Sequence, residues 1–116
     1  MFARCEIANA VLLPALRIAV AKTLSAKYGM RQEEIALALG ISQASVNKYL
    51  NGRYSARIGR VEERVESEKA AEEIVKLIIS NKGREKGRDE RRELERLAES
   101  DRMFRLMERA EGKPAS

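Results

Sequence analysis

Apolar residues recur at helical intervals on both sides of one glycine, Gly40. Ile35 and Leu39 precede the glycine, and Val46 and Leu50 follow it. This spacing puts each pair on one face of a helix, so the segment predicts two short helices joined by a tight turn. Gly40 suits the turn because glycine enters the left-handed backbone region without the penalty that a Cβ causes.

Small and polar residues stand where such a pair of helices needs them. Ala36 lies on the apolar face of the first helix, where the two axes would approach most closely. The Ser42 hydroxyl can accept a hydrogen bond from a free N–H at the start of the second helix. Asn51 and Gly52 mark its end. Together these residues predict a helix-turn-helix unit.

The chain before this unit predicts the helix that completes a three-helix core. Pro14 is tolerated in the first turn of a helix, and an apolar stripe follows it until Tyr28 and Gly29. The stripe consists of Leu16, Ala19, Val20 and Leu24. Residues 5–13 are apolar enough for a short helix that docks on this core or on a partner. We expect Cys5 to be a small buried residue.

The chain after the unit is expected to form a basic linker and then long helices. Residues 53–60 contain three arginines with a serine and a glycine, which favours a linker that lies along a negatively charged partner or simply crosses solvent. Residues 61–80 predict one long helix. Its last part, 74–79, is apolar around nearly its whole circumference and must be buried on several sides.

The C-terminal part predicts a second helical arm. A basic turn is expected at 83–87, and residues 89–110 predict either one helix or two helices separated by a cap at Ser100 or Asp101. The expected fold is therefore all-α, with a helix-turn-helix domain at 1–55, a basic linker at 56–60 and a helical hairpin extension at 61–116.

The second helix of the unit has a polar face opposite its apolar one. If Ile41, Val46 and Leu50 face the core, no acid lies on the outer side. Amides can pair with an adenine edge, serine can donate or accept, alanine can touch a thymine methyl, and lysine can reach guanine. We expect this face to read bases in a DNA major groove. Its residues are Ser42, Gln43, Ala44, Asn47, Lys48 and Asn51.

Charge is concentrated in the same half of the chain. Residues 1–60 contain nine Lys or Arg and three Glu, a net charge of +6, whereas residues 61–116 contain fourteen basic and fifteen acidic residues. No carboxylate lies between residues 42 and 60, as a phosphate-facing surface requires. The expected phosphate contacts are Gln32, Arg53, Arg57 and Arg60. A three-helix unit of this kind also occurs as a structural core or a protein-binding module.

The C-terminal helices carry more apolar surface than two isolated helices can expose. A second copy of the chain would cover it and would supply the second half-site contact that helix-turn-helix proteins commonly use. The expected dimer interface consists of Ile74, Leu77, Ile78, Ile79, Leu97, Phe104 and Met107. Two alternatives stay open. The helices can fold back on their own chain, or they can bind a separate protein partner in an antitoxin-like protein.

Three segments together resemble a known family. They are Cys5-Glu6-Ile7, Leu13-Pro14-Ala15-Leu16-Arg17 and Val46-Asn47-Lys48-Tyr49-Leu50. In this order they resemble the small archaeal transcriptional regulators with a lambda-repressor-like (Cro/repressor-type) helix-turn-helix. The resemblance implies binding of operator DNA as a dimer, with bases read by residues 42–51. Many members carry further cysteines or a fused ligand-binding domain, and this chain has neither, so metal or vitamin sensing is not implied.

The composition offers no catalytic machinery. The chain contains no His, and Cys5 has no second Cys with which to form a disulfide, a catalytic pair or a zinc site. The doublets Glu62-Glu63 and Glu72-Glu73 alternate with basic residues, which is typical of a solvated helix face. We expect no enzyme, cofactor or metal site. No signal peptide or membrane span is recognisable, so we expect a cytoplasmic protein whose main partner is double-stranded DNA.

Overall fold

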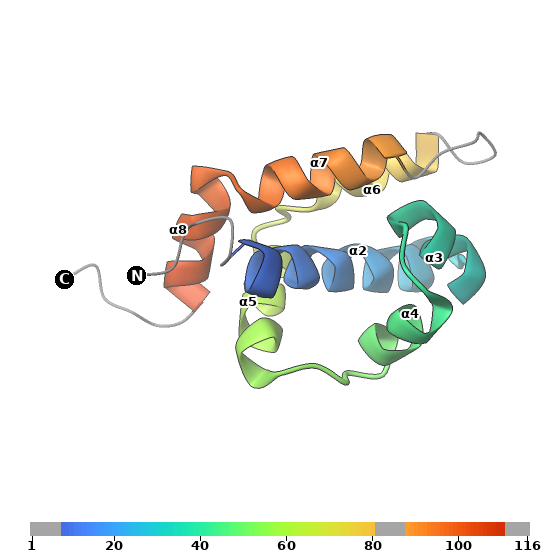
Figure 1. Cartoon of the computed structure of the whole chain (residues 1–116), viewed down its shortest axis with the longest axis horizontal. Coiled ribbons are helices and arrows are strands. Elements are labelled where there is room, and N and C mark those ends of the chain that lie inside the picture. Colours follow the sequence, from blue (N-terminus) through green and yellow to red (C-terminus); the bar gives the residue numbers. More distant parts are fainter. Residues whose placement is uncertain (1–7, 81–87, 111–116) are drawn as a thin grey trace.

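The computed structural model describes residues 8–80 and 88–110, which form helices and contain no strand (Figure 1). The all-α prediction is confirmed. Cys5 and the basic turn expected at 83–87 lie outside the described residues. No helix within the described ranges is long and apolar enough to cross a membrane. The elements are the π-helix η1 (Ala8–Leu12) and the α-helices α2 (Leu13–Tyr28), α3 (Gln32–Leu39), α4 (Gln43–Leu50), α5 (Ala56–Ser67), α6 (Glu72–Ser80), α7 (Arg88–Ala98) and α8 (Asp101–Ala110).

Helix α2 lies at the centre of the fold because it is apolar around most of its circumference. Every other described element except α8 packs against it. In Figure 1, α6 and α7 lie on one side of α2 and α4 lies on the other. Pro14 stands in the first turn and Gly29, with φ 61°, ends the helix, as predicted. The buried residues of α2 are Leu13, Ala15, Leu16, Ile18, Ala19, Val20, Ala21 and Leu24.

The predicted helix-turn-helix forms from α3 and α4. Gly40 has φ 69°, and the N–H of Ile41 donates to the carbonyl of Ala36 at 3.0 Å, which closes the end of α3. Ser42 caps α4, since its Oγ accepts a hydrogen bond from the N–H of Ser45 at 3.1 Å. Both helices pack on α2, so these three helices form the expected core.

The linker predicted at residues 56–60 is wrong in secondary structure, because helix α5 already begins at Ala56. The Ser55 hydroxyl accepts from the N–H of Ile58 at 3.2 Å and caps the helix. Ile58 is partly buried against the core, and Val61 and Val65 are fully buried. Their spacing extends the apolar stripe of α5 toward its N-terminus, and burial of that stripe favours helix over an extended linker.

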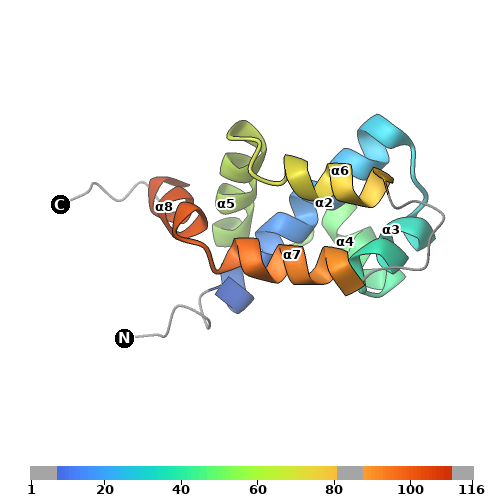
Figure 2. The ribbon, with the colours of Figure 1, turned by 90° about the horizontal axis from the view of Figure 1, so that it is seen from above.

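The single helix predicted at residues 61–80 is divided into α5 and α6. The break contains Lys69, whose φ of 54° lies in the left-handed region, and the N–H of Ala70 bonds the carbonyl of Val65 at 3.0 Å. A left-handed residue other than glycine costs about 1 to 2 kcal/mol. The turn is nevertheless formed, because it lets α5 and α6 run in different directions while both bury apolar residues against α2 (Figure 2).

The C-terminal part contains two helices after α6, which decides between the two alternatives at 89–110. Ser100 separates them: its Oγ donates to the carbonyl of Leu97 at 2.6 Å and accepts from the N–H of Met103 at 3.3 Å. Helices α6 and α7 lie side by side as a hairpin (Figures 1 and 2). Helix α8 turns away and packs on α5, where Arg109 pairs with Glu68 at 2.6 Å.

One apolar cluster includes residues from both sides of the boundaries expected at 55 and 60. Of the residues assigned to a dimer interface, Ile74, Ile78 and Met107 are at most 6% exposed within this single chain. Their apolar character therefore needs no second copy to explain it, because the C-terminal helices fold back on α2 and α5. The other four, Leu77, Ile79, Leu97 and Phe104, are only partly buried.

Replacing Gly40 tests the turn of the helix-turn-helix. Gly40 is exposed, so a side chain at this position meets backbone strain rather than a crowded core. We expect Gly40→Val to lower the free energy of unfolding by about 1 to 3 kcal/mol. Gly40→Asn should cost clearly less, because asparagine tolerates the left-handed region. Urea unfolding of both variants measures the difference, and equal losses would contradict the assigned conformation.

Candidate nucleic-acid interface

Helix α4 has one face in the core and one face in solvent. Val46 is completely buried, while Ile41 and Leu50 are partly buried against the same cluster. The side chains expected to read bases are all on the exposed side, where a groove of DNA could reach them. They are Ser42, Gln43, Ala44, Asn47, Lys48 and Asn51.

Hydrogen bonds along α4 restrict what some of these side chains can offer a ligand. The Ser42 Oγ both caps the helix and donates to the Oγ of Ser45 at 3.0 Å, so a base contact from Ser42 competes with the cap. The Asn51 Nδ2 donates to the backbone carbonyl of Asn47 at 2.9 Å and to its Oδ1 at 3.2 Å. The second contact limits the orientations of the Asn47 amide and uses its Oδ1, so a base edge shares that oxygen with Asn51.

Basic side chains continue the surface beyond α4. Arg53 is exposed in the connection between α4 and α5, and its N–H donates to the carbonyl of Lys48 at 2.8 Å. Arg57 and Arg60 are exposed and lie three residues apart on α5, which puts them on one side of that helix. Gln32, the first residue of α3, is half-buried. The expected phosphate contacts thus come from α3, the connection and α5.

Behind this surface lies a network of three side chains that the sequence did not reveal. The Nζ of Lys22 on α2 donates to the Tyr54 hydroxyl at 2.9 Å and to Oε1 of Glu62 on α5 at 3.0 Å. The Glu62 side chain is 1% exposed, and its Oε2 is buried without a hydrogen-bond partner. The network joins the central helix, the α4–α5 connection and α5.

Burial changes the protonation of this network. It raises the pKa of Glu62 from 4.5 to about 7, and the neighbouring Glu66 carboxylate adds to the rise while the pairing with Lys22 opposes it. Burial alone would lower the pKa of Lys22, but the hydrogen bonds to Tyr54 and Glu62 outweigh it and raise that pKa. Lys22 therefore stays charged, while Glu62 titrates near neutral pH.

The doublet Glu62-Glu63 had been assigned to a solvated helix face, and for Glu62 this is wrong. Glu63 is exposed, but Glu62 follows Ile58 by four residues and precedes Val65 by three, so it falls on the apolar face of α5. This spacing could have predicted the burial of Glu62 from the sequence. An acid at an apolar position needs a nearby basic group, and Lys22, forty residues earlier in the chain, provides it.

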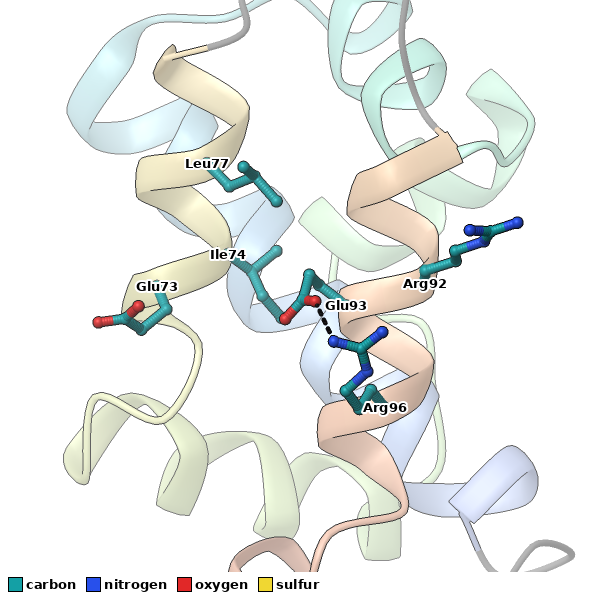
Figure 3. Close-up of a pocket in the computed structure, with 6 residues that line it drawn as sticks. All are labelled: Glu73, Ile74, Leu77, Arg92, Glu93 and Arg96. Carbon is teal, nitrogen blue, oxygen red and sulfur yellow. Dashed lines mark hydrogen bonds and ion pairs between the residues drawn. The ribbon is translucent and has the colours of Figure 1, made fainter.

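A cavity of about 370 Å³ lies between α6 and α7, on the side of α2 away from α4 (Figures 1 and 3). Ile74 and Leu77 form its apolar part, and on the α7 side Arg96 pairs with Glu93, three residues earlier on the same helix, at 2.9 Å. Figure 3 shows Arg92 directed away from the opening. The cavity is therefore separate from the α4 surface. Carboxylates of the described residues form no group of three that could hold a metal ion.

Comparison with protein families supports the assignment of this surface. Residues 23–63 match a family model described as helix-turn-helix, a match that runs from the last turns of α2 through α3 and α4 into α5. The matched region is thus similar to DNA-binding helix-turn-helix units, and it contains every residue assigned above to base or phosphate contact. No curated protein and no solved structure matches the chain significantly.

The raised pKa of Glu62 predicts a pH-dependent stability. Between the ordinary value of 4.5 and the folded value of about 7, the folded chain holds a proton that the unfolded chain has released. This contribution to the free energy of unfolding is complete below the unfolded pKa and is lost as the pH rises through the folded pKa. We expect the melting temperature to fall between about pH 4.5 and about pH 7.

Two neighbouring substitutions separate this effect from other titrations. Glu62→Gln should flatten the pH dependence over that interval, because it removes the titrating group. Glu63→Gln, at an exposed position one residue further on, should leave the slope as in the wild type. Thermal melts followed by circular dichroism compare the three proteins, and a Glu62→Gln variant with an unchanged slope would assign the titration to another group.

Proposed function

We propose that the protein is a sequence-specific DNA-binding regulator of transcription, which acts by occupying its operator and not by catalysis. The observation that carries this proposal is the exposed, acid-free face of α4 beside exposed arginines on the next connection and helix. Helix α4 is narrow enough to enter a major groove, and the neighbouring arginines would then face the phosphates on its edge.

In this proposal the exposed side chains of α4 contact the bases. Gln43 and Asn47 offer amides that match the donor and acceptor of an adenine edge, and Lys48 reaches guanine. Ala44 can contact a thymine methyl. Ser42 and Asn51 take part at the two ends of the helix, where they also cap it or orient Asn47.

Phosphate contact falls to Gln32, Arg53, Arg57 and Arg60. The last two lie in the first half of α5, where no carboxylate precedes Glu62 on the same helix. The α5 N-terminus also carries partial positive charge from its unpaired N–H groups. All of these features favour a negatively charged partner. The second half of α5 is rich in acids, which DNA phosphates repel, so it would lie away from DNA.

A homodimer on a palindromic operator completes the proposal. Two identical reading helices on one face of DNA need half-sites one helical turn apart, about 34 Å, or a multiple of that distance. In Figure 1, α6 and α7 lie across α2 from α4, while α8 lies at one end of the molecule. We propose that the two copies pair near α8, through the partly buried Leu97 at the end of α7 and Phe104 on α8.

The central test separates base reading from phosphate contact. A binding site is first selected from fragmented genomic DNA with the whole protein. Gln43→Ala and Asn47→Ala should then each weaken binding to the selected site by about 1 to 3 kcal/mol and leave binding to random DNA nearly unchanged. Arg53→Ala should weaken binding to both and reduce the salt dependence by about one phosphate contact.

Leu37 provides the matched control for these substitutions. It is 79% exposed but lies on α3, outside the proposed reading face, so Leu37→Ala should bind as the wild type does. Fluorescence anisotropy at several salt concentrations gives all the affinities. Equal losses on selected and random DNA for Gln43→Ala and Asn47→Ala would contradict base reading by α4.

Phe104→Glu tests the placement of the dimer interface. A charge at a paired apolar surface has no partner and is costly to bury, so this variant should sediment as a monomer. Its footprint on the selected site should lose the paired half-site pattern. Leu77→Glu is the control, because Leu77 is also partly buried but lies on α6, across α2 from α4.

The opposite result is equally informative. If Leu77→Glu dissociates the protein while Phe104→Glu does not, the interface lies on α6. A wild type that sediments as a monomer and protects a single half-site would remove the dimer from the proposal while leaving the role of α4 intact.

A further inference from the structure

The connection between α4 and α5 is short, and its backbone is tied to the preceding helix. Gly52 adopts φ 74°, the N–H of Arg53 bonds the carbonyl of Lys48 at 2.8 Å, and the N–H of Tyr54 bonds the carbonyl of Gly52 at 3.1 Å. Ser55 then caps α5. The path of Arg53 is thus coupled to the position of the residue that follows it, Tyr54.

The Tyr54 side chain attaches this connection to two other helices. Its hydroxyl accepts the hydrogen bond from Lys22 on α2, and its ring lies against α5 at Gly59. A Cβ built at Gly59 would stand 3.3 Å from the ring carbon Cε1, so the absence of a side chain there makes room for the ring. Lys22 in turn is held by Glu62, at 3.0 Å.

The contacts that attach Tyr54 are polar, although apolar contacts would contribute at least as much to the free energy of folding. The Glu62 side of the ion pair is buried, whereas the Lys22 side chain is 33% exposed. Replacing a buried charge and its partner by apolar residues of similar volume is often neutral or stabilising. Glu62 also keeps one carboxylate oxygen buried without a partner. What the polar network provides is direction, because a hydrogen bond to the Tyr54 hydroxyl fixes both the distance and the angle of its ring.

We infer that Lys22, Tyr54 and Glu62 form a positioning network that holds Arg53 where it meets a DNA phosphate beside the groove entered by α4. The inference rests on the proposed function. Tyr54 is the positioning residue: it acts on DNA through Arg53, whose exposed side chain is next to it in the chain. Binding then requires no reordering of the connection, which lowers the entropic cost of the contact.

The Tyr54→Phe variant tests the network with little change in packing. It keeps the ring against Gly59 and removes only the oxygen that accepts from Lys22. We expect a melting temperature close to that of the wild type and exchange of the Arg53 amide hydrogen faster by about tenfold, because the connection opens more readily. Affinity for the selected DNA site should fall on the order of tenfold.

A double-mutant cycle separates positioning from general destabilisation. In the wild-type background Arg53→Ala removes a positioned contact, but in the Tyr54→Phe background that contact is already weakened, so the second loss should be much smaller. Tyr28→Phe is the matched control. Tyr28 is 47% exposed at the end of α2, and removing its hydroxyl should change neither amide exchange nor DNA affinity.

Two results would overturn the inference. One is a Tyr54→Phe variant in which the Arg53 amide exchanges at the wild-type rate. The other is a cycle in which the losses from Tyr54→Phe and Arg53→Ala simply multiply, as they do for independent sites. If the wild type selects no DNA at all, the proposed function fails, whereas the exchange measurement still decides whether Tyr54 fixes the connection.

Discussion

Burial of α2 on nearly all sides is the constraint from which the rest of the structure follows. A helix without a polar face has to be covered by other helices, and in this chain all the described elements except α8 contribute to that cover. The cover explains why α6 and α7 fold back on the core. It also explains why α3 and α4 expose only their outer faces, since their inner faces are used to cover the central helix.

The candidate interface depends on the same arrangement. Val46 anchors α4 to the core, so the polar residues on the other side of the helix are presented outward in a fixed orientation. Among the described residues, Glu62, paired with Lys22, is the one buried carboxylate in the cover of α2. Stability alone does not favour such a pair. Its contact with Tyr54 links the interior of the protein to the edge of the proposed DNA surface.

Local rules were sufficient for the features that a few neighbouring residues determine. Gly40, Ser42 and the end of α2 at Gly29 were predicted because a turn or a cap depends on residues within one helical turn of it. The break at Lys69 was missed, since no glycine or proline marks it and only the packing of α5 and α6 on α2 requires it.

Residues far apart in the chain set the remaining features. The early start of α5 and the burial of Glu62 could have been recognised from the register of Ile58 and Val65, but the partner of Glu62 could not. Lys22 lies on a helix forty residues earlier, and no spacing rule connects the two positions. Ile74 and Ile78 were correctly expected to be buried. Their apolar character alone does not determine whether residues of the same chain or of another chain cover them.

The segment that matches the helix-turn-helix family is shorter than the part of the chain that forms the common core. The match begins at residue 23, well inside α2, and ends at residue 63, within α5. Leu16 and Val20, which lie before it, and Val65 and Ile78, which lie after it, complete the same core. A recognisable module boundary here is therefore not a domain boundary. The proposed DNA surface lies within the matched segment, but the core that supports it includes residues on both sides of that segment.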